Sequence, residues 1–165
     1  HWNIAPQDYN GHFLIIPDIT KAQNRRAQLI CDSDLHDLID MVRSSDWKSC
    51  NKDEKNSFIG YNSIGAGASQ NHIHFHGFAS PSPLFTFDFA QTPPFYENKD
   101  LKMHIRSGYH SRNCSCSCIE VQTKNATDIS SVTHDVSLLL RVIAENMHPF
   151  NIVIGDDNIF IFVRM

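Results

Sequence analysis

Three histidines alternate with other residues in one short run of this 165-residue chain. The run is Gln70, Asn71, His72, Ile73, His74, Phe75, His76, Gly77 and Phe78. Successive side chains of a β-strand point to opposite faces, so a strand here would place all three imidazoles on one face. Three neighbouring imidazoles are costly to bury without partners. The pattern therefore indicates either a metal site or nucleophilic chemistry on phosphate.

The segment that precedes the histidines favours a phosphate-binding site. Residues 60–71 are mostly small and include Gly60, Gly65 and Gly67. Glycine lets the backbone approach a ligand closely, and the N–H and hydroxyl groups of such a loop suit phosphate oxygens. An ordinary turn would explain the glycines alone. Their position directly before three alternating histidines favours a phosphate site.

A metal site is the competing interpretation. One-residue spacing on a strand also suits metal ligands, which usually recruit further Asp, Glu or His side chains. Candidates elsewhere in the chain, which the sequence does not place near the array, are His12, Asp88, His104 and His110. A histidine nucleophile instead needs a neutral nitrogen and neighbours that hold its ring. In this array His74 can attack, while His72 and His76 fix its tautomer and contact phosphate oxygens.

Charge and cysteine content exclude several protein classes. A net charge of −4 argues against a general surface for nucleic acid or anionic membranes. No apolar run approaches the ~20 residues that span a bilayer, and the first residues of the sequence do not have the pattern of a secretory h-region. Five cysteines, an odd number, favour reduced thiols and a cytoplasmic protein. Cys114, Cys116 and Cys118 lack the spacing of zinc ligands and suit the packing of a strand.

The pattern of apolar residues predicts an α+β fold, an antiparallel sheet with packed helices. The expected elements are a hairpin over 2–17, a helix over 32–44 capped by Asp32 or Ser33, a loop over 47–55, a strand from 57, strands over 105–122, a helix over 128–145 capped by Asp128, and a hairpin over 151–163. We interpret the proline- and aromatic-rich stretch 79–100 as an ordered segment that covers a site or a partner. The length suits one domain, 1–165.

Both halves of the chain combine a hairpin with an amphipathic helix, which would fit two degenerate halves. The first residue is His1 rather than Met, so we expect a piece of a longer enzyme.

Two segments resemble the histidine triad (HIT-like) superfamily. Residues 72–78 resemble its signature, and Gly11 to Pro17 resembles the Gly-His-hydrophobic-Pro strand that precedes the signature. The wider pattern over 2–12, 60–72 and 149–162 is similar to the GDP-hexose phosphorylases, which are the plant GDP-L-galactose and animal GDP-D-glucose enzymes. The resemblance covers most of the chain and implies a HIT-like nucleotidyltransferase domain, either a dimer or a pseudo-dimer of two such halves.

This resemblance implies guanylyl transfer in two steps without a metal or other cofactor. His74 would attack the α-phosphorus of a GDP-hexose, here GDP-D-glucose, and release hexose 1-phosphate. Inorganic phosphate would then take GMP from His74 to give GDP. His72 would orient His74, and the third catalytic residue would be His76. The residues that would contact phosphate or line the nucleotide side are Asn62, Ser63, Gly65, Gly67, Ser69, Gln70 and Asn71.

Two alternatives stay open at this point. The third position of the triad is Gln in the plant-type enzymes, whereas His76 matches the hydrolases of the superfamily. A nucleoside-phosphate hydrolase that uses water as acceptor is therefore the first alternative. The second is a non-catalytic nucleotide-binding domain that keeps the pocket.

Overall fold

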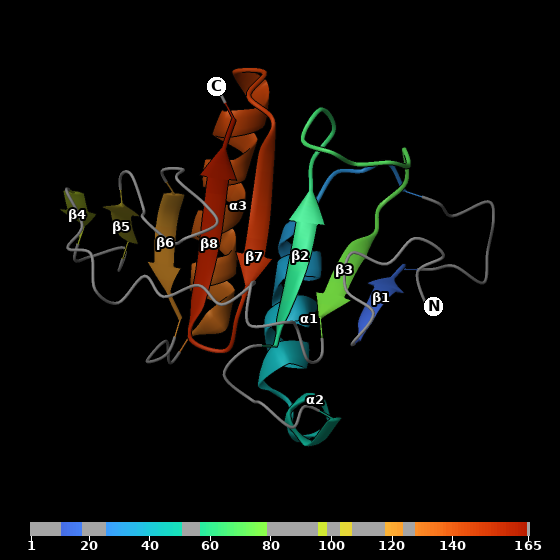
Figure 1. Cartoon of the computed structure of the whole chain (residues 1–165). Helices are drawn as coiled ribbons and strands as arrows, with labels where there is room; N and C mark the ends of the chain where they lie inside the picture. The colour runs from blue at the N-terminus through green and yellow to red at the C-terminus, as the bar shows by residue number, and fades with distance from the viewer. Residues whose placement is uncertain are drawn as a thin grey trace.

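Eight strands form one antiparallel sheet in the part of the chain that the computed structural model describes (Figure 1). The described residues are 11–17, 26–50, 57–78, 96–98, 103–106, 118–123 and 128–164. The strands are β1 (His12–Ile15), β2 (Phe58–Asn62), β3 (Phe75–Phe78), β4 (Tyr96–Asn98), β5 (Met103–Arg106), β6 (Cys118–Gln122), β7 (Phe150–Ile154) and β8 (Asn158–Val163). Their order across the sheet is β1-β3-β2-β7-β8-β6-β5-β4.

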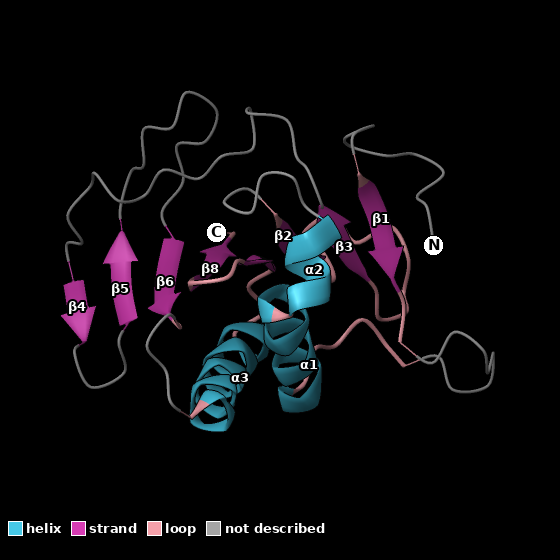
Figure 2. Ribbon diagram, turned by 90° about the horizontal axis from the view of Figure 1, so that it is seen from below, coloured by secondary structure: helices cyan, strands magenta, loops and turns pink. Residues whose placement is uncertain are grey.

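Helices lie against one side of this sheet (Figure 2). They are α1 (Asp32–Arg43), α2 (Ser45–Cys50) and α3 (Ile129–Glu145). The long helices α1 and α3 form because apolar residues recur every three or four positions, which gives each one a buried stripe. The buried apolar residues of these stripes are Leu35, Leu38, Ile39, Val42, Val136, Leu140 and Ile143. The predicted α+β class, an antiparallel sheet with packed helices, is confirmed.

The two long helices begin differently. Asp128 caps α3 as predicted, because its carboxylate accepts a hydrogen bond from Ser131 N at 3.2 Å. The cap of α1 is Cys31 rather than Asp32 or Ser33, because the helix already includes those two residues. The backbone N–H of Cys31 donates to Asp34 Oδ2 at 3.0 Å, which closes the first turn.

The loop expected over 47–55 is wrong for its first residues, which belong to α2. Ser44 Oγ accepts a hydrogen bond from Trp47 N at 3.1 Å and so starts this short helix. The indole of Trp47 packs 5.8 Å from the ring of Phe13, and its N–H donates to Ser57 Oγ at 3.0 Å. Tertiary packing of one tryptophan therefore offsets a polar local sequence that favours a loop.

The sheet has two chemically different faces, because side chains alternate along each strand. The face against the helices carries the apolar core, and its members from the strands include Ile59, Tyr61, Phe75, Phe150, Ile152, Ile154, Ile159 and Ile161. The residues between them point to the other face, which we call the histidine face. Asn62 pairs with Asn151 there, and the neighbouring ladder places His12 and His76 on alternate rungs.

Gly77 lies opposite Phe13 in the ladder between β1 and β3, on the helix side of the sheet. A Cβ atom at this position would lie 2.4 Å from the ring of Phe13, its partner across the ladder. Glycine is required here because the aromatic ring occupies the space that any side chain would need.

The hairpin predicted over 151–163 is confirmed by β7 and β8, with Gly155 N donating to Asn158 O at 2.9 Å in the turn. The strands predicted over 105–122 correspond to β5 and β6, and residues 107–117 between them lie outside the described residues. Residues 2–10, most of the stretch 79–100, and Cys114 and Cys116 also lie outside them. No helix in the described ranges is long and apolar enough to cross a bilayer.

Candidate active site

The three histidines form one row of neighbouring rings. The ring centroids of His72 and His74 are 5.6 Å apart, and those of His74 and His76 are 5.2 Å apart. The strand expected over 72–78 is shorter than predicted, because β3 begins at Phe75 and only His76 belongs to its ladder. The row therefore needs another support for its first two members.

That support is a buried glutamine, Gln28, which is fully shielded from solvent. Its Oε1 accepts a hydrogen bond from His74 N at 3.0 Å. Its Nε2 donates to the carbonyl oxygens of Asn62 at 2.9 Å and of His74 at 3.3 Å. One side chain thus satisfies the backbone of His74 in both directions, as a neighbouring strand would do.

The segment that carries Gln28 is anchored at both ends. Arg26 O accepts a hydrogen bond from Ile73 N at 2.9 Å, next to the histidine row. The guanidinium of Arg26 binds both carboxylate oxygens of Asp34, with Nη1 to Oδ2 at 3.1 Å. Burial opposes ionisation of Asp34, but hydrogen bonds from Arg26 and Cys31 outweigh it and hold the pKa of that carboxyl below its usual value.

His74 has a defined tautomer. Its Nδ1 lies 2.9 Å from the carbonyl oxygen of His72. A carbonyl only accepts, so Nδ1 carries a proton, and in the neutral ring Nε2 then keeps its lone pair. The main chain of His72, rather than its imidazole, therefore fixes the tautomer of His74. His74 is buried, with 3% of its surface exposed.

His76 is held as a neutral imidazole on the histidine face. Its Nδ1 lies 2.9 Å from Nε2 of His12, and its Nε2 lies 3.5 Å from Nδ2 of Asn62. The ring of His12 in turn stacks on Phe78 with a centroid distance of 4.5 Å. Burial, followed by the proximity of His12 and His74, lowers the pKa of His76 to about 4.

Acidification is expected to destabilise the protein through His76. Its pKa is about 4 in the folded chain and 6.5 without the fold. Between these values the unfolded chain binds more protons, so the free energy of unfolding falls as the pH drops, by at most ~2 kcal/mol once partial exposure of the ring is allowed for. Urea unfolding of the wild type and of His76→Gln at about pH 7 and pH 4.5 measures the difference. Equal pH dependence in the two proteins would contradict the assignment.

The glycine loop between β2 and the histidines has the backbone that glycine permits. Gly65 has φ +82° and Gly67 has φ +96°, a region that other residues rarely adopt. Ala66 N donates to Ser63 O at 2.9 Å and closes the turn. The segment that joins this loop to His72 is exposed and contains Ser69, Gln70 and Asn71.

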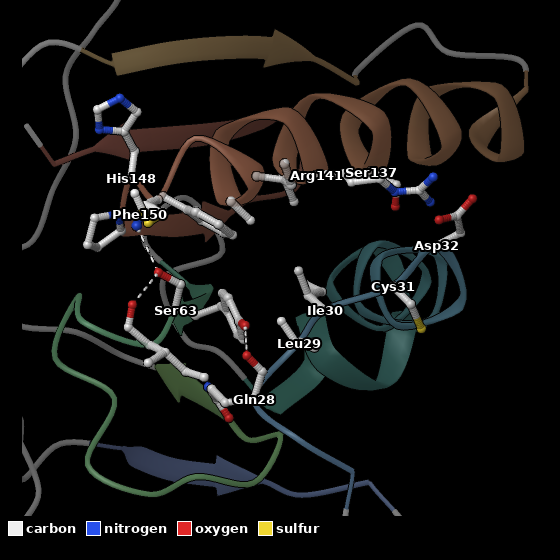
Figure 3. A pocket seen from close by; sticks show the side chains of 16 residues that line it. Gln28, Leu29, Ile30, Cys31, Asp32, Ser63, Ser137, Arg141, His148 and Phe150 are labelled. Atoms are coloured by element: carbon white, nitrogen blue, oxygen red, sulfur yellow. Dashed lines mark hydrogen bonds between the residues drawn. The ribbon is translucent and has the colours of Figure 1, made fainter.

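The structure places Asn62 and Ser63, the first two residues predicted to contact phosphate, on opposite sides of the sheet. Asn62 lies on the histidine face, within reach of His76. Ser63 instead lies on the helix side, where its Oγ accepts a hydrogen bond from Phe150 N at 2.8 Å. Figure 3 shows Ser63 among the residues that line a cavity of about 430 Å³ between the segment 28–32 and α3. In this position the Ser63 hydroxyl anchors the start of the glycine loop to the backbone of Phe150 on the helix side.

Among the described residues, no three His, Cys, Asp or Glu side chains are arranged to hold a metal ion. Of the candidate ligands named from the sequence, the structure brings His12 to the array. The side chain of His104, and Asp88 and His110 as a whole, lie outside the described residues.

Sequence reasoning did not identify two residues of this site by their role. His12 was visible only as a candidate ligand and as part of the strand over 11–17, and its contact with His76 requires the ladder between β1 and β3. Gln28 carried no signal, because it precedes a helix in a polar segment and acts through contacts 34 and 46 residues away.

Solved structures of other proteins share this architecture. Yeast Ap4A phosphorylase Apa2 in complex with AMP aligns with a TM-score of 0.56 and 15% identity, over 93% of this chain and 51% of that one. A DUF4931 family protein from Bacillus cereus aligns with a TM-score of 0.62 and 13% identity, over 98% of this chain and 79% of that one. The fold is HIT-like. The HIT-like fold that the resemblance implied is therefore confirmed.

No protein-family model matches the chain, and no curated protein matches it in sequence. The chain spans about half the length of Apa2, since it covers 51% of that structure. The similarity to Apa2 extends to its complex with Ap4A, with a TM-score of 0.56. The similarity is one of HIT-like fold and does not reach the GDP-hexose branch.

Proposed function

We propose that this chain carries the nucleophile of a nucleotidyltransferase that works through His74. The observation that carries the proposal is the hydrogen bond of Nδ1 to the His72 carbonyl, which leaves the Nε2 lone pair of a neutral ring for attack. Gln28 holds the backbone of His74, and the flanking rings hold its side chain. Such preorganisation is what an in-line attack on phosphorus needs.

The reaction balances in two steps. In the first, Nε2 of His74 forms a bond to the α-phosphorus of the nucleotide, and the bond from that phosphorus to the bridging oxygen breaks. The leaving group departs as a sugar phosphate and takes the electron pair. In the second, an oxygen of inorganic phosphate attacks the same phosphorus, the P–N bond breaks, and a nucleoside diphosphate leaves.

The proposed substrate is a GDP-hexose, here GDP-D-glucose, and the proposed acceptor is inorganic phosphate. The sequence pattern over 60–72 supports this choice through its resemblance to the GDP-hexose phosphorylases. The solved structures of similar fold support the wider class, because Apa2 is a phosphorylase of Ap4A and one of its structures contains AMP. The proposed phosphate contacts are Gly65, Gly67, Ser69, Gln70 and Asn71, with Asn62 beside His76.

Turnover of GDP-D-glucose by the full-length protein tests the function. We expect GDP and glucose 1-phosphate to form only when inorganic phosphate is present, and we expect ADP-glucose and Ap4A to react more slowly. The measurement is product analysis for GDP, GMP and sugar phosphate, with and without phosphate. Turnover of Ap4A alone would replace the proposed substrate while keeping the proposed chemistry.

His76 at the third position supports hydrolysis as the second candidate function. GMP formation that does not respond to phosphate would favour this hydrolase over the phosphorylase. Binding of a guanine nucleotide without any turnover would favour a binding domain and would overturn the nucleotidyltransferase proposal.

A further inference from the structure

A row of side-chain hydrogen bonds crosses the histidine face from Arg164, the residue after β8, to the triad. Arg164 Nε donates to Asn151 Oδ1 at 2.9 Å. Asn151 Nδ2 donates to Asn62 Oδ1 at 2.6 Å and to the carbonyl oxygen of Ala66 at 2.8 Å. Asn62 Nδ2 then faces His76 Nε2 at 3.5 Å, at the outer limit of a hydrogen bond. We call this set the amide relay.

Only one direction of donation is open to the relay. The Nε–H of Arg164 can only donate, so the atom of Asn151 that faces it is the oxygen. The carbonyl of Ala66 can only accept, so the atom of Asn151 that faces it is the nitrogen. These two fixed partners orient the amide of Asn151 independently of each other. Asn62 must then present its oxygen to Asn151 and its nitrogen to His76.

The relay thereby determines where His76 carries its proton. An N–H group of Asn62 faces Nε2, so this nitrogen keeps its lone pair. A neutral imidazole with a bare Nε2 has its proton on Nδ1, and Nδ1 donates to Nε2 of His12. Burial also keeps the ring neutral, since it lowers the pKa of His76 to about 4. His76 and His74 therefore share the same tautomer.

We propose that Asn151 and Arg164 are positioning residues that hold His76 without a proton on Nε2, and that this restricts transfer to leaving groups that depart without a proton. The first half follows from the contacts of the amide relay. The second half rests on the proposed function, because it assumes that His74 attacks phosphorus and that His76 lies beside the leaving group.

The chemical consequence concerns the class of substrate. A phosphate leaving group is already an anion at neutral pH, so it departs from phosphorus without general acid help. An amine leaving group requires a proton, and a positioned acid would contribute about 10²–10⁴-fold to its departure. A His76 with a bare Nε2 cannot supply that proton. The site therefore suits nucleoside phosphoanhydrides and disfavours nucleoside phosphoramidates.

Asn151→Asp tests the relay through a residue that reaches His76 by way of Asn62. One carboxylate oxygen still accepts from Arg164, but the other can no longer donate to Asn62. Asn62 must then turn its amide and present its oxygen to His76, which forces the proton from Nδ1 to Nε2. Nitrogen-15 NMR of the histidine side chains in the full chain reads this proton directly. We expect Nδ1–H in the wild type and Nε2–H in the variant.

Two further variants complete the NMR experiment. Asn146→Asp makes the same amide-to-carboxylate change at the C-cap of α3, where Asn146 donates to Val142 O outside the relay, and should leave His76 unchanged. Asn62→Asp serves if Asn151→Asp does not fold, because a carboxylate facing Nε2 requires Nε2–H and raises the pKa of His76. Nε2–H in the wild type, or an Nε2 that still lacks a proton in the folded variant tested, overturns the relay.

The ratio of kcat/KM for GDP-D-glucose to that for a guanosine phosphoramidate tests the second half. We expect the wild type to prefer the anhydride by at least ~100-fold, and Asn151→Asp to reduce that preference about tenfold or more. An unchanged ratio in a variant whose tautomer has switched overturns the leaving-group proposal and leaves the relay intact. No turnover of either compound by the wild type, with the expected NMR result, overturns the proposed function instead.

Discussion

His74→Ala is expected to abolish nucleotidyl transfer while the sheet and helices remain folded. The variant lacks the Nε2 that forms the bond to phosphorus, and Nε2 of the neighbouring His76 faces Asn62. Loss of a covalent nucleophile lowers kcat by about three to six orders of magnitude. The measurement is phosphate-dependent GDP formation from GDP-D-glucose at saturating substrate.

His36→Ala is the matched control for this experiment. His36 lies on α1 and pairs with Asp40 at the surface, at 3.3 Å, away from the histidine row. It should keep full activity. Mass spectrometry after mixing with substrate in the absence of phosphate should show a guanylyl adduct on the wild type and on His36→Ala, and none on His74→Ala. Near-normal turnover by His74→Ala would eliminate His74 as the nucleophile.

Gln28→Leu is expected to cause a large loss of stability. Leucine has a similar volume, but it leaves the N–H of His74 and the carbonyls of His74 and Asn62 without the partner that Gln28 provides. Each buried backbone group left unsatisfied costs about 1–3 kcal/mol. We expect the free energy of unfolding to fall by ~3 kcal/mol or more, measured by urea denaturation.

Gln28→Glu distinguishes the hydrogen bond that Gln28 accepts from the two that it donates. Glutamate can still accept from His74 N, but it cannot donate to the two carbonyls and places a charge in a fully buried position. A loss at least as large as that of Gln28→Leu is expected. If both variants unfold like the wild type, Gln28 does not hold the histidine row.

Much of the fold could be predicted because its signals are local. The helix over 128–145 has an apolar stripe and a capping aspartate within the same segment, and both are present in α3. The hairpin of β7 and β8 needs only two apolar runs and a polar turn. The row of histidines could be predicted for the same reason, since a spacing of two residues suffices to place side chains on one side.

The remainder depends on contacts between distant segments. The stability of α2 depends on Trp47 reaching Phe13 and Ser57, and its own sequence does not indicate these contacts. Asn62 and Ser63 lie on opposite sides of the sheet. This placement depends on where β2 ends and on the contact of Ser63 with Phe150, 87 residues away. The orientation of Asn62 depends on Asn151, which could not be read from the chain because asparagines in strands have no distinctive pattern.

The contacts of Gln28 also bear on when this protein becomes able to act. That one side chain joins a segment before α1 to the end of β2 and to the nucleophile, across 34 and 46 residues of sequence. These segments meet only after the loops between them have closed, which is a slow and global event in folding. Partly folded chains would therefore lack an aligned nucleophile, and they could not consume nucleotide or label themselves wastefully. Catalytic competence would rise and fall together with the cooperative folding of the whole sheet.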